Sequence, residues 1–401
     1  MAYVTGGFGG RRGIVAAALA MVCVAGTLEA APVVSVEKAG MERTVVSVET
    51  QSPTPEAKAF NDCLRRNISI SGVFILGDSG SVKVAGVPGA GVTVTGNGRQ
   101  ISFPRKFTDA KSARMAAREL VDAMVANYGG EGAKGFATDR IVFVNRLGSD
   151  NADLYTAYAD GYDIRCESRE GHAIVGPRWA PNGRDIYFTG FREKTPLIYK
   201  FDGTAGKIKR LAPFKGLATG AAISPDGRKA ALILSFQGNP ELYVMDLADG
   251  SVQRITRTRG ASEASPCWSP DGSRIAYVSD ETRSPQIYIV DVATKKSVRF
   301  TNQGSQNTNP DWSARGGLTW ATKRQGVNYI AVADPAAGER SHRLVTDGGS
   351  WEHPTWASDG RHIAADRDRA IFLIDADPES DTKPVQMFLN KGNWMSPSFT
   401  R

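Results

Sequence analysis

Hydrophobic and polar positions repeat with a period of about 44 residues over the C-terminal two thirds of the chain. Each copy opens on an aromatic or aliphatic anchor, continues into a turn of the Ser-Pro-Asp-Gly type, and then gives two apolar runs and a more polar one. The anchors are Trp179, Ile223, Trp268, Trp312 and Trp356. They lie 44, 45, 44 and 44 residues apart, and such a constant spacing indicates an internal structural repeat.

The turn tetrapeptide predicts a hairpin in each copy. At Ser269–Gly272, Pro occupies the second turn position, where its fixed φ suits a type I turn, and Gly occupies the position that needs a positive φ. The apolar runs Ile275–Val278 and Ile287–Asp291 and the more polar run Ser297–Thr301 follow. Together with the strand around the anchor, they make four strands per repeat, which is typical of a β-propeller blade.

The number of blades follows from the second strand of each copy. Six such strands begin at Ile141, Ile186, Ala230, Ile275, Leu318 and Ile363. The first of them has no anchor strand before it, whereas the chain ends in a stray half-motif, Trp394–Phe399. We therefore predict a six-bladed propeller closed by the C-terminal strand, because closure removes the two exposed edges of an open ring. The alternative, a linear β array, leaves the half-motif without a role.

Residues 32–137 follow another pattern, which predicts a small α/β domain. Strands are predicted at 33–36, 44–48 and 73–76, with two more within 81–103, and helices at 56–66 and 109–128. Thr108 or Asp109 is expected to cap the second helix, and Gly129 to end it. The predicted fold is thus multidomain, an N-terminal α/β domain at 32–137 followed by an all-β propeller at 138–401.

The first 31 residues are predicted to be a cleaved signal peptide. Arg11 and Arg12 precede an uncharged apolar stretch, Gly13–Ala25, which is too short for a membrane span and typical of an export signal. An uncleaved anchor is the alternative. Beyond residue 31 no apolar run is long enough for a membrane span, which excludes a polytopic membrane protein.

Composition and charge exclude further classes. Hydrophobic residues make up 41% and charged residues 23%, which is ordinary for a folded chain. The net charge of +7 is spread without a dense Lys/Arg run, so we expect no nucleic-acid partner. Removal of the signal leaves Cys63, Cys166 and Cys267, widely separated and without a C-x-x-C pair. Buried thiols are therefore favoured over a metal site, and one long-range disulfide is the alternative.

The sequence contains little evidence for a catalytic site. Gly77–Gly80 is similar to the nucleophile sequence of trypsin-like proteases, but that chemistry needs a His base and a buried Asp, and all four His lie in the propeller. No G-x-S-x-G is present. His353 and His362 lie nine residues apart on different predicted strands, which is not a zinc spacing. The recurring Trp residues favour core packing over sugar stacking. We predict no catalytic residue, no cofactor and no metal.

The domain order and the propeller repeats together resemble the TolB family, the periplasmic components of the Tol–Pal system. The resemblance covers most of residues 130–401. It is carried by Asp139–Ile141, Tyr158–Tyr162, Glu241–Leu247, Gly304–Asn307 and Trp394–Pro397. Residues 77–107 depart from the family, because they are too short and too Gly-rich for the further helix and strand of its α/β domain.

The resemblance implies a non-enzymatic, monomeric periplasmic scaffold that helps to maintain outer-membrane integrity and constriction at cell division. It implies that the Pal lipoprotein binds one propeller face and that TolA binds the N-terminal segment. Loops that join the last strand of one blade to the first strand of the next converge on one face. The candidate partner contacts there are Arg259, Ser262, Glu263, Ser305, Gln306, Asn307, Ser350 and Glu352.

The predicted N-terminal strand consists of Val33, Val34, Ser35 and Val36. Its alternating Val residues suit addition to the sheet edge of a partner. The alternative is a permanent hairpin with Thr44–Val48, in which Gly40 lies in the turn. Two other functions compete with the scaffold: an exported propeller of another pathway, and a propeller lyase or peptidase.

Overall fold

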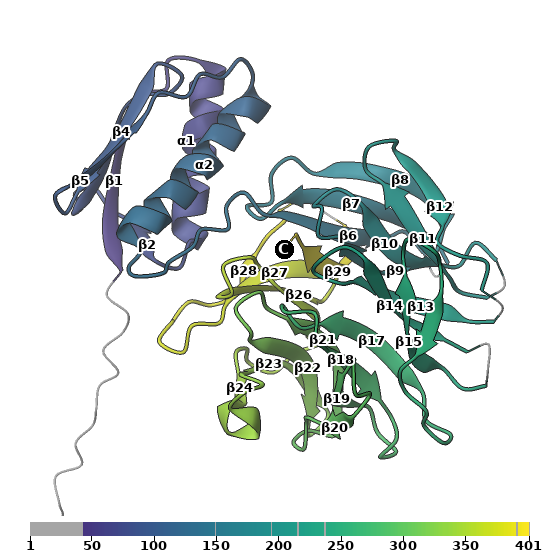
Figure 1. Ribbon diagram of the computed structural model, residues 1–401. Coiled ribbons are helices and arrows are strands. Elements are labelled where there is room, and N and C mark those ends of the chain that lie inside the picture. Colours follow the sequence, from purple (N-terminus) through teal and green to yellow (C-terminus); the bar gives the residue numbers. More distant parts are fainter. Residues whose placement is uncertain are drawn as a thin grey trace, which may run out of the picture. The chain divides into compact units, whose positions relative to one another are not determined.

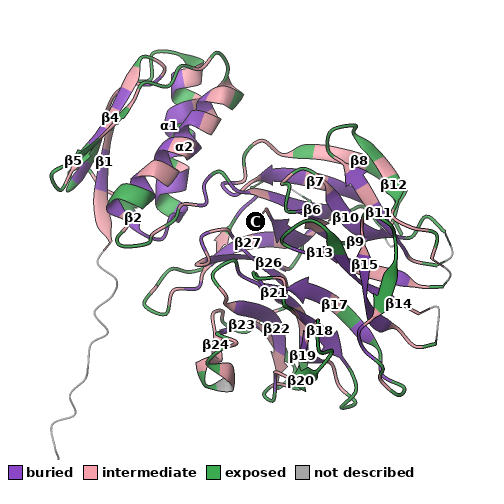
Figure 2. Cartoon of the chain, viewed as in Figure 1, coloured by how far each residue is buried: buried purple, intermediate pink, exposed green. Residues whose placement is uncertain are grey.

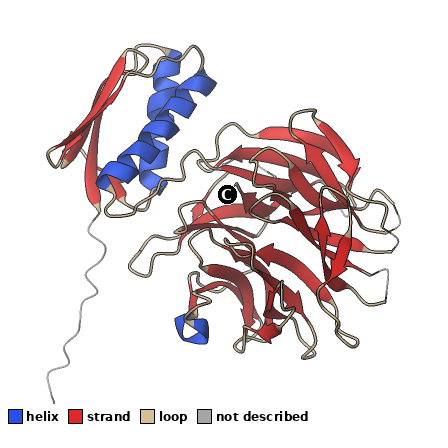
Figure 3. Ribbon diagram, viewed as in Figure 1, coloured by secondary structure: helices blue, strands red, loops and turns tan. Residues whose placement is uncertain are grey.

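The computed structural model describes residues 43–148, 150–193, 195–214, 216–235, 238–389 and 392–400. The predicted signal peptide and the predicted strand Val33–Val36 lie outside these residues. Residues 40–401 form one compact unit, so the predicted division at 137/138 stays a prediction. Its described residues contain one five-stranded sheet with two α-helices, and six four-stranded sheets (Figures 1 and 3). Among the described helices, none combines the length and the apolar character that crossing a membrane requires.

The five-stranded sheet has the strand order β2-β1-β3-β4-β5. Strand β1 pairs in parallel with both β2 and β3, while β3, β4 and β5 form an antiparallel meander. The elements are β1 (Thr44–Thr50), α1 (Pro55–Ile70), β2 (Phe74–Leu76), β3 (Val82–Val87), β4 (Gly91–Gly96), β5 (Arg99–Phe103) and α2 (Ala110–Tyr128).

Both helices begin at a capping residue. The side chain of Thr54 accepts a hydrogen bond from the Ala57 amide at the start of α1. Asp109 caps α2, and its exchange of hydrogen bonds with Ser112 makes a capping box. Gly129 follows the last turn of α2, as predicted. Apolar side chains of both helices, including Leu64 and Leu120, pack with inward-facing residues of the sheet in one core.

Residues 81–103 contain three strands, and the prediction of two was wrong. The extra break is at Asn97 and Gly98, which both have a positive φ and join β4 to β5 in a two-residue hairpin. Asn-Gly is the preferred sequence for such a turn because both residues tolerate the left-handed region. The stretch holds no helix, in line with its length and glycine content.

The six remaining sheets are the predicted blades, and Figure 1 shows them arranged around an axis. Blade 1 contains β6 (Arg140–Arg146), β7 (Ala152–Tyr158) and β8 (Arg165–His172). Blade 2 contains β9 (Ile174–Trp179), β10 (Ile186–Gly190), β11 (Leu197–Asp202) and β12 (Lys207–Arg210). Blade 3 contains β13 (Ala218–Ile223), β14 (Lys229–Leu234), β15 (Glu241–Asp246) and β16 (Val252–Arg254).

The other three blades repeat this order. Blade 4 contains β17 (Glu263–Trp268), β18 (Arg274–Ser279), β19 (Gln286–Asp291) and β20 (Ser297–Arg299). Blade 5 contains β21 (Gln306–Trp312), β22 (Leu318–Arg324), β23 (Val327–Ala333), the short helix η1 (Gly338–Ser341) and β24 (Arg343–Leu344). Blade 6 contains β25 (Glu352–Trp356), β26 (His362–Arg367), β27 (Ala370–Asp375) and β28 (Val385–Gln386).

The C-terminal strand closes the ring, which confirms the prediction made from the half-motif. Strand β29 (Trp394–Phe399) pairs antiparallel with β6, so that Trp394 lies opposite Asn145 and Phe399 opposite Ile141. The Thr400 amide extends the ladder by donating to the Arg140 carbonyl at 2.8 Å. Blade 1 therefore takes three strands from the start of the propeller and one from the end of the chain.

The Ser-Pro-Asp-Gly turns have the predicted geometry. At Ser269–Gly272 the glycine amide donates to the serine carbonyl at 2.9 Å, and Gly272 has a φ of +69°. The hydroxyl of Ser269 donates to Asp271, and this bond lowers the pKa of the Asp271 carboxyl to about 2. The turn is thus fixed by its own side chains as well as by Pro and Gly.

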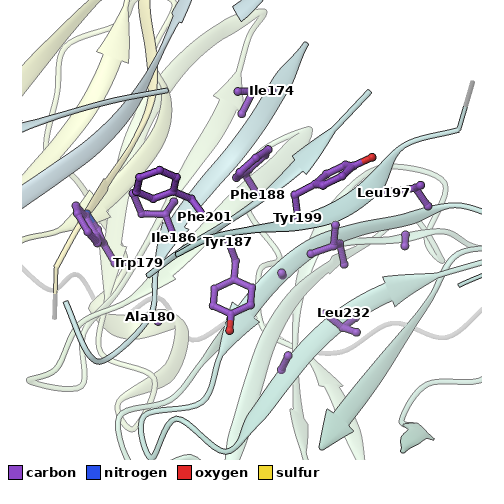
Figure 4. Packing of buried hydrophobic residues seen from close by; sticks show 14 of the residues in the cluster. Ile174, Trp179, Ala180, Ile186, Tyr187, Phe188, Leu197, Tyr199, Phe201 and Leu232 are labelled. Atoms are coloured by element: carbon purple, nitrogen blue, oxygen red, sulfur yellow. The ribbon is translucent and has the colours of Figure 1, made fainter. Parts of the chain in front are cut away.

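The blades pack through alternating side chains. In Figure 4, Phe188 and Tyr187 point to opposite sides of β10, and the Phe188 ring stacks on Tyr199 of β11 at a centroid distance of 5.8 Å. The middle strands of the blades are buried along most of their length (Figure 2). All four anchor Trp residues are buried, as core packing predicts. In the part of the chain that the structure describes, Cys63, Cys166 and Cys267 form no disulfide with one another, and Cys63 and Cys267 are buried.

Candidate binding face and central channel

The antiparallel order of each blade separates two ends of the ring. The Ser-Pro-Asp-Gly turns, between the first and second strands, and the turns between the third and fourth strands lie at one end, here called the turn face. The connections between blades and the hairpins between second and third strands lie at the other end, here called the loop face. All eight predicted contact residues belong to connections of the loop face or to the strand starts that follow them.

Six of the eight predicted residues have exposed side chains on blades 4, 5 and 6. They are Arg259, Ser262, Ser305, Gln306, Ser350 and Glu352. Glu263 and Asn307 are buried, at 2% and 0% exposure, so the interpretation of these two as loop contacts without a role in packing is wrong. Each stands near the start of a first strand, where its side chain turns into the space between blades.

Glu263 is buried beside a second carboxyl, that of Glu241. Glu263 accepts hydrogen bonds from Ser279 at 3.1 Å and Thr258 at 3.2 Å. Burial, together with the charge of Glu241, raises the pKa of Glu263 to about 8. Burial also opposes ionisation of Glu241, but hydrogen bonds from Thr256 and Arg254 outweigh it and lower the pKa of Glu241. The pair therefore carries one proton at neutral pH.

The next repeat has uncharged residues at the same two positions. Asn307 donates to Gln286 at 2.8 Å and accepts a hydrogen bond from the Trp320 indole at 2.8 Å. The amides of Glu263 and Asn307 donate to the carbonyls of Pro240 and Pro285, respectively, which shows that the positions are equivalent. Blades 4 and 5 are thus joined by amide side chains, whereas the carboxyl pair joins blades 3 and 4.

A left-handed residue interrupts the first strand of every blade near the loop face. The six residues are Gly176, Gly220, Ser265, Asn309, His353 and Ser396, with φ between 48° and 65°. Each lies in a β-bulge, where the pairing with the second strand changes register. Four of the six are not glycine, and such residues are strained in this region. At Gly220 a Cβ atom would also lie 2.9 Å from the Pro266 side chain of the next blade. The bulges line a small pocket at the axis.

An ion pair spans the channel at the level below the bulges. The first strands neighbour one another around the ring in the order β9, β13, β17, β21, β25 and β29, so blades 2 and 5 are opposite each other. Arg178 of β9 donates to Asp311 of β21 at 2.8 Å. Asp311 is fully buried and also accepts the Trp356 amide and the Thr355 hydroxyl. Arg178 lines both the bulge pocket and a larger cavity toward the turn face.

Glu352, His353 and Asp366 form a cluster at the bulge of blade 6. Their ligand atoms all lie within 4.8 Å of one another, so they could offer one nitrogen and two carboxylate oxygens to a metal ion. His353 Nδ1 lies 2.9 Å from Asp366, which also accepts the Ser396 amide. Burial disfavours the charged ring, but Asp366 outweighs this and raises the pKa of His353. The sequence does not reveal the cluster, because Asp366 lies on the neighbouring strand β26, 13 residues after His353.

The N-terminal candidate, Val33–Val36, lies outside the described residues. Its alternative partner in a hairpin, Thr44–Val48, belongs to β1, which already carries strands on both sides. Residues Thr44–Val46 pair with β2, and residues Val46–Thr50 pair with β3. A hairpin between Val33–Val36 and β1 would therefore have to pair with the edge residues of β1 that β2 and β3 leave unpaired.

Comparison with known proteins supports the family suggested by the repeats. The family model described as the TolB beta propeller domain matches residues 131–399. Two relatives from strains of Anaeromyxobacter dehalogenans, both named Tol-Pal system protein TolB, are 33% and 32% identical to this chain over 171 residues. These alignments cover 43% of this chain but span 38% of the length of the relatives.

Solved structures share the fold. TolB from Acinetobacter baumannii matches with a TM-score of 0.77 and 22% identity, over 91% of this chain and 98% of that one. A putative TolB from Agrobacterium tumefaciens matches with a TM-score of 0.50 and 18% identity, over 63% of this chain and 88% of that one. A chain of a nidogen/laminin complex, 11% identical, also matches, with a TM-score of 0.54 over 66% of this chain and 98% of that one. The first match extends beyond the propeller.

Proposed function

Because the chain belongs to the TolB β-propeller family, we propose that it is a protein-binding scaffold of the Tol–Pal system and not an enzyme. In this proposal the signal peptide directs the chain to the periplasm. There it supports outer-membrane integrity and constriction during division. The observation that carries the proposal is the set of six exposed polar side chains, from Arg259 to Glu352, on three consecutive blades of the loop face.

The loop face suits a protein partner better than a small substrate. The exposed side chains come from connections between blades, and a rigid scaffold that presents such loops is a common arrangement for recognition. The buried carboxyl and amide pairs at Glu263 and Asn307 hold the bases of two of these connections. We assign the Pal lipoprotein to this face, since the family resemblance implies it.

Charge and size changes on the loop face test this assignment. The variant Arg259→Glu, Gln306→Arg, Glu352→Lys alters three exposed side chains and should weaken capture of Pal at least tenfold while the melting temperature stays unchanged. The matched control, Arg228→Glu, Ala248→Arg, Glu379→Lys, makes the same charge changes on the turn face, where all three residues are exposed. Unaltered Pal capture by the first variant, or equal loss with the control, would refute the assignment.

We further propose that Val33–Val36 binds TolA by adding a strand to its sheet. Strand addition depends on main-chain donors, so replacing Val34 and Val36 with Pro should abolish TolA binding, whereas replacing both with Thr should preserve it. Pal binding and thermal stability should remain those of the parent chain in both variants. Retained TolA binding by the Pro variant, combined with lowered stability, would instead support the permanent hairpin.

A further inference from the structure

The central channel widens toward the turn face into a cavity of about 360 Å³. Three anchor indoles, Trp179, Trp268 and Trp312, line it together with the Phe399 ring. Pro225 and Pro270 of the Ser-Pro-Asp-Gly turns contribute further apolar surface. The volume falls in the range of small-molecule sites, which are mostly apolar with a few placed polar groups.

Arg178 is the single charged side chain among the residues that line this cavity. Its side chain remains 22% exposed, whereas its partner Asp311 is fully buried. Asp311 accepts hydrogen bonds from the backbone amide of Trp356 as well as from Arg178, so the carboxylate is held in place and in turn holds the guanidinium. A guanidinium has five N–H donors, and the contact with Asp311 leaves donors for an acceptor in the cavity.

The three indoles of the wall differ in how their N–H donors are satisfied. Trp268 donates from Nε1 to the Ala222 carbonyl, and Trp312 donates to the Gly316 carbonyl, each at 2.9 Å. The Nε1 of Trp179 is buried and has no hydrogen-bond partner among the described residues. Buried donors are nearly always paired in native proteins, so this wall has one donor more than the described chain satisfies.

We propose that this cavity binds a small aromatic carboxylate. Its ring would lie among the indoles and the Phe399 ring, and its carboxylate would accept hydrogen bonds from Arg178. The apolar wall supplies affinity through burial of the ring, and the guanidinium selects an anion over a neutral or cationic analogue of the same shape. The site lies on the opposite side of the Arg178–Asp311 pair from the bulge pocket and the loop face.

Three indole derivatives of similar size test the charge preference by isothermal titration calorimetry on the full mature chain. Indole-3-acetate should bind at least tenfold more tightly than its neutral isostere indole-3-acetamide. Tryptamine, which carries a cation on the same ring, should bind more weakly than either. Equal affinity for the acetate and the acetamide, or tighter binding of tryptamine, would overturn the proposal.

Two variants test the location. Ala314 is exposed at the rim of the cavity, so Ala314→Trp should fill it and weaken indole-3-acetate binding at least tenfold. Ala248→Trp is the matched control, since Ala248 is an exposed turn-face alanine outside the residues that line the cavity. If the two variants bind alike, the ligand does not occupy this cavity.

The double variant Arg178→Met, Asp311→Asn tests the anchor without leaving a buried charge unpaired. It should reduce the preference for acetate over acetamide to about one, with little effect on the affinity for the acetamide. A preference that survives this change would refute the role of Arg178. Should this variant fail to fold, the Ala314→Trp comparison still decides the proposal, because it leaves the ion pair intact.

Discussion

Arg118 of α2 and Asp160 of the β7–β8 turn form a salt bridge in which both side chains are fully buried. The guanidinium donates from Nε at 2.7 Å and from Nη2 at 3.1 Å, and it lies 3.8 Å from the centre of the Tyr158 ring. Asn67 of α1 donates to the same carboxylate at 2.9 Å. Arg118 also donates to Asp163 at 2.9 Å, so the two helices are joined to blade 1 through a network of buried and partly buried ion pairs.

Removing one partner of this pair should destabilise the chain strongly. Arg118→Met leaves Asp160 buried without its counter-charge, and breaking such a pair costs about 3–5 kcal/mol. We expect a lower midpoint in urea unfolding followed by tryptophan fluorescence. The control is Arg105→Met. Arg105 precedes α2 and forms a partly exposed ion pair with Glu119 of that helix, so its loss should change stability by less than about 1 kcal/mol. Similar effects of the two substitutions would contradict this account.

The contact between Arg118 and Asp160 could not be predicted from the sequence. Asp160 belongs to the family motif at Tyr158–Tyr162. Nothing in the sequence indicates that its partner is Arg118, which lies on α2, a helix that packs against the five-stranded sheet. By contrast, the closing strand was predictable, because Trp394–Phe399 repeats a pattern already present in the chain. Patterns local to one repeat are readable from sequence, whereas contacts between distant segments depend on the packing of the whole fold.

Glu263 marks an intermediate case. Its place in a connection between blades predicts a partner contact, yet it is buried against Glu241 of the preceding blade. The internal repeat contains a sequence signal for this contact between blades. Glu241 and Gln286 occupy one repeat position, and Glu263 and Asn307 another, so both positions prefer side chains that can bond to each other. The Arg178–Asp311 pair carried no comparable signal, because six different residues occupy that position.

Ring closure should depend on the packing of β29. Phe399 is 2% exposed, and Phe399→Ala should cost about 3–5 kcal/mol through lost burial and the resulting void. Deleting residues 392–401 should go further and give aggregated protein, since blade 1 would lose a strand and leave an unpaired edge. Thermal unfolding and size-exclusion chromatography measure both effects. Leu389→Ala, at a residue with 90% exposure, is the control and should melt like the parent chain.

The carboxyl pair should make stability fall as the pH rises. The folded pKa of Glu263, about 8, lies above its usual value of 4.5, so the folded chain binds a proton that the unfolded chain releases. The stabilisation is complete below pH 4.5 and is lost as the pH rises through about 8. Glu263→Gln removes this dependence, so its melting temperature relative to the parent should increase from pH 5 to pH 8.5.

A matched substitution controls the pH experiment. Glu379 is an exposed carboxylate in the turn between β27 and β28, and Glu379→Gln should leave the slope of melting temperature against pH close to that of the parent. If Glu263→Gln follows the parent at every pH, the two buried carboxyls do not share a proton.

The left-handed backbone at each bulge should determine which substitutions there destabilise the protein. Asn309 has a φ of 54°, a region that Asn and Gly tolerate and β-branched residues do not. Asn309→Gly should change stability by less than about 1 kcal/mol, whereas Asn309→Val should cost about 1–3 kcal/mol. Thr308→Val is the control, at a neighbour in the same strand without a positive φ. Equal effects of the two Val substitutions in chemical denaturation would argue against strain at the bulge.

The ion pair across the axis has a topological consequence for any partner of the ring. Since Arg178 and Asp311 meet from opposite blades, their ion pair crosses the central channel between the bulge pocket and the larger cavity. A partner can insert a side chain or the tip of a loop as far as the guanidinium, but it cannot thread a strand through. Recognition at the loop face must therefore come from docking around the rim, and release needs no unthreading step.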